Sequence, residues 1–226
     1  MCGKFTQMAS WADATTFFNA LGLMAEGEPV VVATPMRFAK IIRLSADGQR
    51  ELVPMRWGFP DRAASNPSAP KHMHARCETI DQRPTFAESF RSRRGILMVE
   101  TFNEGEELPS GKTKQWVIRP RDRKPIAIAV IYEEWINDLG GKDEQLLTFV
   151  QVTTPASALI SKITDRMPAI LPPADWPKWL GEIPASPGEV KALLKTFDDG
   201  GNWEMSEQAT AKRKQGLLDG QRDLFS

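Results

Sequence analysis

Residues 38–60 read FAKIIRLSADGQRELVPMRWGFP. Two apolar runs, residues 38–44 and 51–55, flank Asp47-Gly48, a dipeptide typical of the turn in a β-hairpin. The second run continues into Trp57-Gly58-Phe59-Pro60, where glycine and proline indicate that the strand bends or ends. This stretch therefore predicts a sheet built from antiparallel neighbours.

The rest of the chain adds short strands and helices in no regular order. Strands are expected at residues 3–8, 30–33, 95–100, 116–118, 126–131 and 144–153, and helices at 11–21, 85–91, 155–163, 175–180 and 187–197. The strands at 116–118 and 126–131 should pair with each other around a basic turn. Without a βαβ alternation, the expected class is α+β, a curled, mostly antiparallel sheet (a pseudo-barrel) with peripheral helices. We expect one domain over residues 1–203 and a polar, mobile tail over residues 204–226.

Composition limits the possible functions. Lysine plus arginine and aspartate plus glutamate both total 29 in 226 residues, so any nucleic-acid binding must come from a local patch. No run is apolar and long enough to span a membrane, and the start lacks a signal pattern. Cys2 and Cys77 make neither a disulfide framework nor a zinc set. We expect a cytoplasmic monomer with reduced thiols and no metal or cofactor, associated with the nucleoid if bacterial.

The first residues, Met1-Cys2-Gly3-Lys4-Phe5, offer unusual chemistry. If Met1 is removed, Cys2 carries a free α-amine and a thiol on adjacent carbons. The amine can form an imine with an aldehyde, and the thiol can then add to the same carbon and close a thiazolidine ring. An α-amine has a pKa of about 7.7–8.0, so it is nucleophilic near neutral pH. The alternative is that Cys2 is a small apolar residue that begins a strand.

Further motifs occur in a fixed order along the chain. They are Met1–Phe5, Pro54–Pro60 with its Trp-Gly, Ala75-Arg76-Cys77-Glu78-Thr79, Phe102-Asn103-Glu104, Thr153-Thr154-Pro155-Ala156 and Asp165-Arg166-Met167-Pro168. In this order they resemble the SRAP family, the SOS response-associated peptidases that include abasic-site shielding proteins. The resemblance covers roughly residues 2–180.

The resemblance implies a specific activity. Family members remove their own Met1, bind single-stranded DNA at abasic sites, and form a thiazolidine crosslink between Cys2 and the ring-opened sugar. This would make the chain an autocatalytic peptidase with a DNA-crosslinking, lyase-like activity in the DNA-damage response. Glu104 matches the family's glutamate, which would act as general acid and base. The alternative for Glu104 is a solvated residue at a strand end.

Two positions depart from the family pattern. Thr164 stands where the family has histidine, and His74 stands where it has asparagine. Threonine cannot carry a proton near neutral pH, whereas histidine can. One hypothesis is that His74 has taken over proton handling. The other is that His74 only hydrogen-bonds the Cys2 amine and Thr164 reflects a partial loss of function.

DNA contacts follow from the same resemblance. Arg76 and Arg166 match arginines that touch phosphates near the lesion, although an internal salt bridge with Asp165 or Glu78 is the alternative. Trp57, Phe59 and Pro35 lie in segments that line the family's DNA groove. The Trp-Gly-Phe-Pro segment is one residue shorter than usual, and Trp57 as an ordinary core residue is the competing interpretation.

The chain ends in Gln221-Arg222-Asp223-Leu224-Phe225-Ser226. Gln221, Leu224 and Phe225 resemble the short peptide that binds the replicase sliding clamp, and an unremarkable tail is the alternative. Three classes of function remain open: a DNA-crosslinking enzyme that processes itself, a module that binds single-stranded or branched DNA without covalent capture, and a cysteine peptidase acting on other proteins. The last is disfavoured because no Cys-His-Asn pattern accompanies Cys2.

Overall fold

The computed structural model describes residues 4–7, 32–60, 70–137, 144–198 and 200–208. Its strands are β1 (Lys4–Gln7), β2 (Val32–Ala33), β3 (Phe38–Leu44), β4 (Arg50–Trp57), β5 (Phe59–Pro60), β6 (Pro70–His72), β7 (His74–Arg76), β8 (Arg94–Glu107), β9 (Thr113–Pro120), β10 (Ile126–Asn137), β11 (Glu144–Pro155), β12 (Arg166–Pro168) and β13 (Trp203–Glu207). The described helices are α2 (Pro84–Ser92), α3 (Trp176–Leu180) and α4 (Pro187–Lys191), with 3-10 turns η1 (Ile160–Lys162) and η2 (Pro173–Asp175). The predicted helix at residues 11–21 lies outside the described residues.

Five strands close into a barrel. The pairings run from β8 to β3, β4, β11 and β10, and then back to β8. Only the contact between β4 and β11 is parallel within this ring. The hairpin predicted from residues 38–55 is confirmed, because β3 and β4 pair from Leu44↔Arg50 to Phe38↔Arg56. The predicted class, α+β around a curled and mostly antiparallel sheet, is also confirmed.

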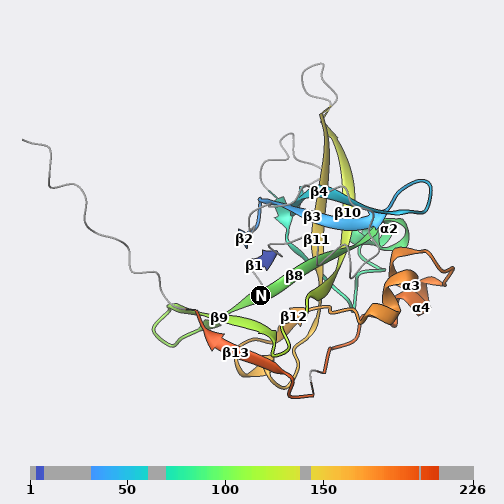
Figure 1. Cartoon of the computed structure of the whole chain (residues 1–226). Coiled ribbons are helices and arrows are strands. Elements are labelled where there is room, and N and C mark those ends of the chain that lie inside the picture. Colours follow the sequence, from blue (N-terminus) through green and yellow to red (C-terminus); the bar gives the residue numbers. More distant parts are fainter. Residues whose placement is uncertain (1–3, 8–31, 61–69, 138–143, 199, 209–226) are drawn as a thin grey trace, which may run out of the picture.

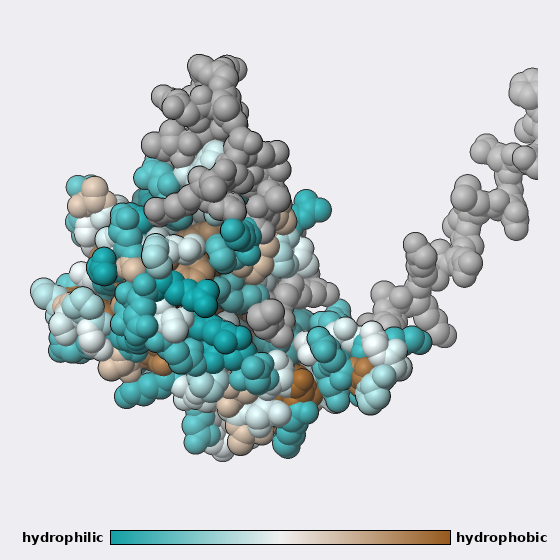
Figure 2. Space-filling view, turned by 180° about the vertical axis from the view of Figure 1, so that it is seen from behind, coloured by the Kyte–Doolittle hydropathy of each residue, from teal (hydrophilic) through white to brown (hydrophobic). Residues whose placement is uncertain are grey.

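Successive side chains of each strand point to opposite faces of the sheet, which creates two hydrophobic cores, one inside the barrel and one outside it. Ile41, Leu97 and Phe149 belong to the inner cluster, whereas Ile42, Ile96 and Val150 belong to the outer cluster. The outer cluster lies beneath the helices, which gather on one side of the barrel (Figure 1). The described surface seen from behind is mostly hydrophilic (Figure 2).

Gly58 lets the chain pass from one core to the other. Its φ of 117° lies in the region that favours glycine, and its N–H donates to the carbonyl of Phe149. Trp57, just before it, packs inside the barrel, and Phe59, just after it, packs outside. The Trp-Gly-Phe sequence is therefore a bend that serves both cores.

β8 is the strand on which the other parts assemble. Its first half pairs with β10 and β3, and its second half pairs with β1 and β9. The expected pairing of strands 116–118 and 126–131 is therefore wrong, since β9 and β10 each pair with β8 instead. The reason is that one long strand offers both of them a partner without a tight turn.

Two other predictions differ from the structure. The helix expected over residues 155–163 is absent: β11 continues to Pro155, which pairs with Arg166 of β12, and a single 3-10 turn, η1, follows. Strand pairing outweighs the local helix signal there. The domain also continues past residue 203, because β13 pairs with β9 as far as Glu207, and Trp203 packs on Phe102 with ring centroids 6.0 Å apart. Among the described residues, no helix has the length and apolar character needed to cross a membrane.

Candidate nucleic-acid and abasic-site pocket

The candidate site is built on alternate residues of β11. Phe149 is in register with Trp57 on β4, and Gln151 is in register with His74 on β7. One step further, Thr153 is in register with Arg76. Residues in register on parallel strands share a face of the sheet, so these pairs form three successive layers. The first layer, with Trp57, is apolar. The second, with His74, is polar, and the third carries the positive charge of Arg76.

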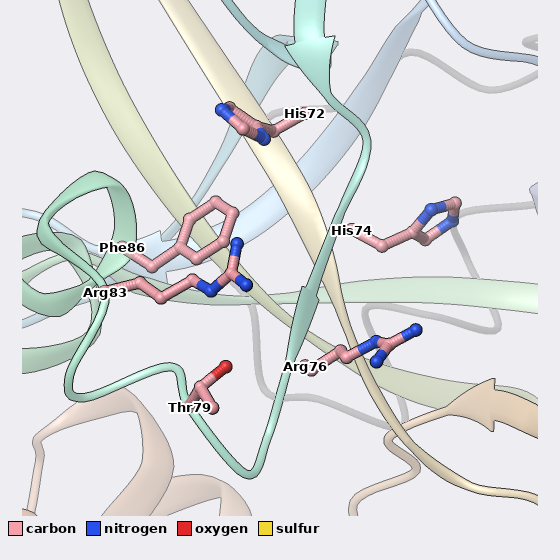
Figure 3. Close-up of a pocket in the computed structure, with 6 residues that line it drawn as sticks. All are labelled: His72, His74, Arg76, Thr79, Arg83 and Phe86. Carbon is pink, nitrogen blue, oxygen red and sulfur yellow. The ribbon is translucent and has the colours of Figure 1, made fainter.

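A pocket of about 360 Å³ opens beside the polar and cationic layers, those of His74 and Arg76 (Figure 3). It is lined by His72, His74, Arg76, Thr79, Arg83 and Phe86. His74 and Arg76 project from β7 to the same side, and the side chain of Arg83 extends from the start of α2 toward β7 (Figure 3). The ring of His72 meets Phe86 edge-on with centroids 5.5 Å apart. The sequence has only two histidines, and both line this pocket.

The pocket is electropositive because its arginines are not neutralised. Within the described part of the chain, neither Arg76 nor Arg83 takes part in an ion pair, whereas the nearby carboxylates are engaged elsewhere. Glu78 is bound by Arg166 at 2.6 Å, and Asp81 is bound by Lys191 at 2.6 Å. Two uncompensated guanidinium groups in a concave site suit an anionic ligand, and arginine matches phosphate geometry well.

Glu104 lies in the second half of β8, beyond the part of that strand that closes the barrel. It is 1% exposed, and it follows Phe102 by two residues in a regular part of β8, so its side chain is on the same face as Phe102, a member of the inner cluster. Phe5 of β1 pairs with Phe102, and its ring lies 5.1 Å from that of Trp57, centroid to centroid. Trp57 in turn contacts His74 edge-on at 5.8 Å. A continuous set of packed side chains thus joins the strand that carries Glu104 to the pocket.

The N-terminal strand approaches Glu104 directly. β1 pairs antiparallel with β8, and its first residue, Lys4, is opposite Asn103. Cys2, the predicted nucleophile, lies outside the described residues. The other cysteine, Cys77, is buried, and burial, together with the neighbouring Glu78 carboxylate, raises the pKa of its thiol. A thiol with a raised pKa is a poor nucleophile, so Cys77 does not compete for this role.

Arg166 adopts the alternative left open by its sequence, an internal salt bridge. Its guanidinium donates to both oxygens of Glu78, at 2.6 and 3.0 Å, and to the carbonyl of Thr153 at 2.8 Å. The side chain is only 10% exposed. In this structure Arg166 therefore braces β12 against β11 rather than presenting its charge to solvent. Thr164, two residues earlier, is half-buried and donates its backbone N–H to Ile160.

Two predicted DNA-stacking residues, Trp57 and Phe59, are buried in this structure. Trp57 and Phe59 are both 0% exposed, and the indole N–H of Trp57 donates to the carbonyl of Met73 at 3.0 Å. A ring without exposed surface cannot stack on a base, so both belong to the core in this structure. Pro35 is half-buried in a turn that leads to Met36 and to Phe38, a residue that is 54% exposed.

Sequence reasoning missed four pocket residues: His72, Thr79, Arg83 and Phe86. His72 and His74 stand two residues apart, a spacing that could have drawn attention to the first histidine. Arg83 had no comparable signal, because its position depends on where α2 begins. The pairing of Gln151 with His74 was likewise invisible before the strand register was known.

Comparison with known proteins finds relatives both by sequence and by fold. Residues 1–211 match the family model described as SOS response associated peptidase (SRAP). The abasic site processing protein YoqW of Bacillus subtilis is 30% identical over 202 residues, covering 88% of each chain. HMCES of Xenopus tropicalis, also named an abasic site processing protein, is 26% identical over 160 residues, which are 60% of this chain and 47% of that protein.

Solved structures agree on the fold. A crystal structure from Bordetella bronchiseptica superimposes with a TM-score of 0.76 at 19% identity, covering 92% of this chain and 100% of that one. A second, from Bacteroides thetaiotaomicron, gives a TM-score of 0.72 at 21% identity and covers 91% of each chain.

Proposed function

Because the chain belongs to the SRAP family, we propose that it processes abasic sites in single-stranded DNA, by removing Met1 and capturing the lesion covalently through Cys2. The observation that carries this proposal is the register of β1 on β8, in which Lys4 is opposite Asn103, next to Glu104. Two peptide units join Cys2 to Lys4, so their Cα atoms are at most about 7.6 Å apart. The proposal therefore requires the amine and thiol of a processed Cys2 to reach this buried carboxyl across no more than these two peptide units.

The covalent reaction needs an amine, a thiol and groups that transfer protons, which Cys2, Glu104 and His74 would supply. A proton leaves the C1′ hydroxyl of the closed sugar and another is added to the ring oxygen, which opens the ring to an aldehyde. The Cys2 amine attacks C1′, and loss of one water gives an imine. The Cys2 sulfur then adds to the same carbon, the nitrogen takes the thiol proton, and a thiazolidine results. In this scheme Glu104 and His74 move the protons, and Arg76 and Arg83 hold the phosphates.

Intact mass spectrometry tests the proposal. The purified protein should lack Met1, and with an abasic single-stranded oligonucleotide it should gain the mass of the DNA minus one water. Cys2→Ser should lose this stable adduct, whereas Cys77→Ser, the matched control, should retain it. Glu104→Gln should slow the reaction by about 100-fold or more if the carboxyl transfers protons. A protein that has lost Met1 but forms no adduct would refute covalent capture.

A second candidate is a module that binds DNA without reacting with it. Thr164 favours this reading, because the histidine usual at this position in the family is missing and proton transfer could be impaired. Tight binding of a non-reactive tetrahydrofuran analogue, combined with no adduct on a true abasic site, would support the binding module. Restoration of adduct formation by Thr164→His would then identify the missing proton carrier.

We also propose that the C-terminal peptide binds a sliding clamp. The supporting feature is the sequence of Gln221, Leu224 and Phe225, which lies outside the described residues. The double variant Leu224→Ala and Phe225→Ala should lose binding to purified clamp, while Arg222→Ala should keep it. Failure of the intact protein to bind the clamp would eliminate this partner.

A further inference from the structure

Gln151 is a buried amide whose hydrogen-bonding groups are unused. The residue is 0% exposed, and within the described residues neither its Oε1 nor its Nε2 has a hydrogen-bond partner. Burying an amide without partners is unfavourable, and buried side-chain amides in proteins are bonded in the large majority of cases. A leucine would fill similar space without this cost. An amide at this position therefore indicates a partner that completes its hydrogen bonding.

The strand register identifies that partner. Gln151 lies opposite His74 on the neighbouring parallel strand, and the two side chains share a face of the sheet. On one side of this pair is the apolar layer of Trp57 and Phe149, and on the other Thr153 already accepts from Arg166 at 3.2 Å. The His74 imidazole is thus the polar group placed beside the amide by the pairing of β7 with β11.

We propose that Gln151 is a positioning residue for His74, with its amide linked to the imidazole through one ordered water, since the structure, which describes both residues, shows no direct hydrogen bond from the amide to the ring. The inference rests on the proposed function insofar as it gives His74 a part in proton transfer. The water can accept from one ring N–H and donate to the amide oxygen, so that a proton can be exchanged at the other ring nitrogen. When that nitrogen takes up a proton, the first N–H still has its acceptor. Gln151 can therefore hold the ring in both protonation states.

The charges around His74 make such an anchor useful. His72, Arg76 and Arg83 line the same pocket, and Glu104 is buried on β8, on the same face as Phe102 of the inner cluster. The two guanidinium groups repel an imidazolium and would favour its rotation away from them. A neutral partner fixes the ring without adding a charge that would alter the electrostatic balance of the pocket.

Imidazole NMR tests the contact without any DNA. The protein has only two histidines, so the His72→Gln variant assigns the nitrogen and carbon resonances of His74. Gln151→Leu should change the tautomer ratio and the titration midpoint of His74. Gln151→Glu should raise that midpoint, since a neighbouring carboxylate favours the imidazolium. If the His74 resonances of Gln151→Leu match those of the wild type at every pH, the inference is overturned.

Crosslinking kinetics test the consequence. At saturating abasic DNA, Gln151→Leu should react between about 5-fold and 100-fold more slowly. Its affinity for the tetrahydrofuran analogue should stay within about twofold, because no phosphate ligand has changed. Its melting temperature should equal or exceed that of the wild type, because an unpaired buried amide has been removed. In a His74→Asn background, Gln151→Leu should have no further effect on the rate.

Thr154→Val provides the matched control. Thr154 is 0% exposed and its hydroxyl is also without a partner among the described residues, but it lies on the opposite face of β11, with Val150 and Val152. The Thr154→Val variant should be stabilised, as Gln151→Leu should be, but its crosslinking rate should not change. Equal slowing in both variants, or an undiminished effect of Gln151→Leu in the His74→Asn background, would contradict the inference. Absence of adducts in the wild type would contradict the proposed function alone, because the NMR result stands independently.

Discussion

The ion pair between Glu78 and Arg166 shows how a single residue can differ from its expected role. The Arg166 guanidinium, by hydrogen bonding, holds the pKa of the Glu78 carboxyl at about 2, below its ordinary value of 4.5. A carboxyl whose pKa is lower in the folded state stabilises the protein above the unfolded pKa. This contribution is lost as the pH falls from about 4.5 to about 2.

Glu78→Gln should therefore lower the free energy of unfolding at pH 7 by about 1–2 kcal/mol, since the buried Arg166 loses its charged acceptor, whereas the 45% exposure of the Glu78 side chain lets solvent screen part of the pair. The difference from the wild type should shrink as the pH approaches 2. Urea denaturation over this pH range measures both effects. Glu88→Gln, which removes an exposed pair with Arg93 at 3.1 Å, should cost less than about 1 kcal/mol. An equal loss in the two variants would argue against a structural role for Arg166.

At the scale of the strands, β8 and β3 pack closely at Gly95. A Cβ added to Gly95 would lie 2.6 Å from Cγ2 of Ile41 and 2.9 Å from the carbonyl oxygen of Ile42. The backbone oxygen cannot move without disturbing the pairing of β3 with β8. Gly95→Ala should therefore destabilise the protein by about 1–3 kcal/mol.

Thermal or urea unfolding of Gly95→Ala should be compared with that of Gly188→Ala. Gly188 lies in α4, and no atom lies within 4 Å of a Cβ added there. Alanine favours a helix over glycine by about 1 kcal/mol, so the control should be neutral or stabilising. Unchanged stability in Gly95→Ala would mean that the barrel wall can open at this contact.

The elements that the sequence predicted correctly are those with strong local signals. The Asp47-Gly48 hairpin and α2, whose first residue is Pro84, follow from residues close together in the chain. Other features depend on contacts between distant segments. These are the strand partners of β9 and β10, and the pairing of Pro155 with β12 where a helix over residues 155–163 was expected. The same limit applies to the site: the motifs indicated His74, Glu104 and Arg76, but only the register brings Gln151 beside His74.

At the scale of the whole molecule, the balance of charges limits how DNA can be held. The net charge is zero, so attraction to DNA must arise from local basic patches such as the pocket and not from a general field. Each phosphate neutralised on a single strand contributes about 0.7 to the slope of log affinity against log salt. If Arg76 and Arg83 each hold one phosphate, these two contacts supply a slope of about 1.4.

Arg83→Gln should therefore reduce the salt slope for a tetrahydrofuran-containing strand by about 0.7 and weaken binding at low salt. Arg91→Gln makes the same change of charge on the same helix, at an exposed residue that does not line the pocket. It should leave the slope nearly unchanged, because attraction that depends only on total charge falls off within a Debye length of about 10 Å at 0.1 M salt. Fluorescence anisotropy from 50 to 200 mM salt measures both slopes. Identical reductions in the two variants would show that the pocket holds no particular phosphate and that the chain senses DNA only through its summed charge.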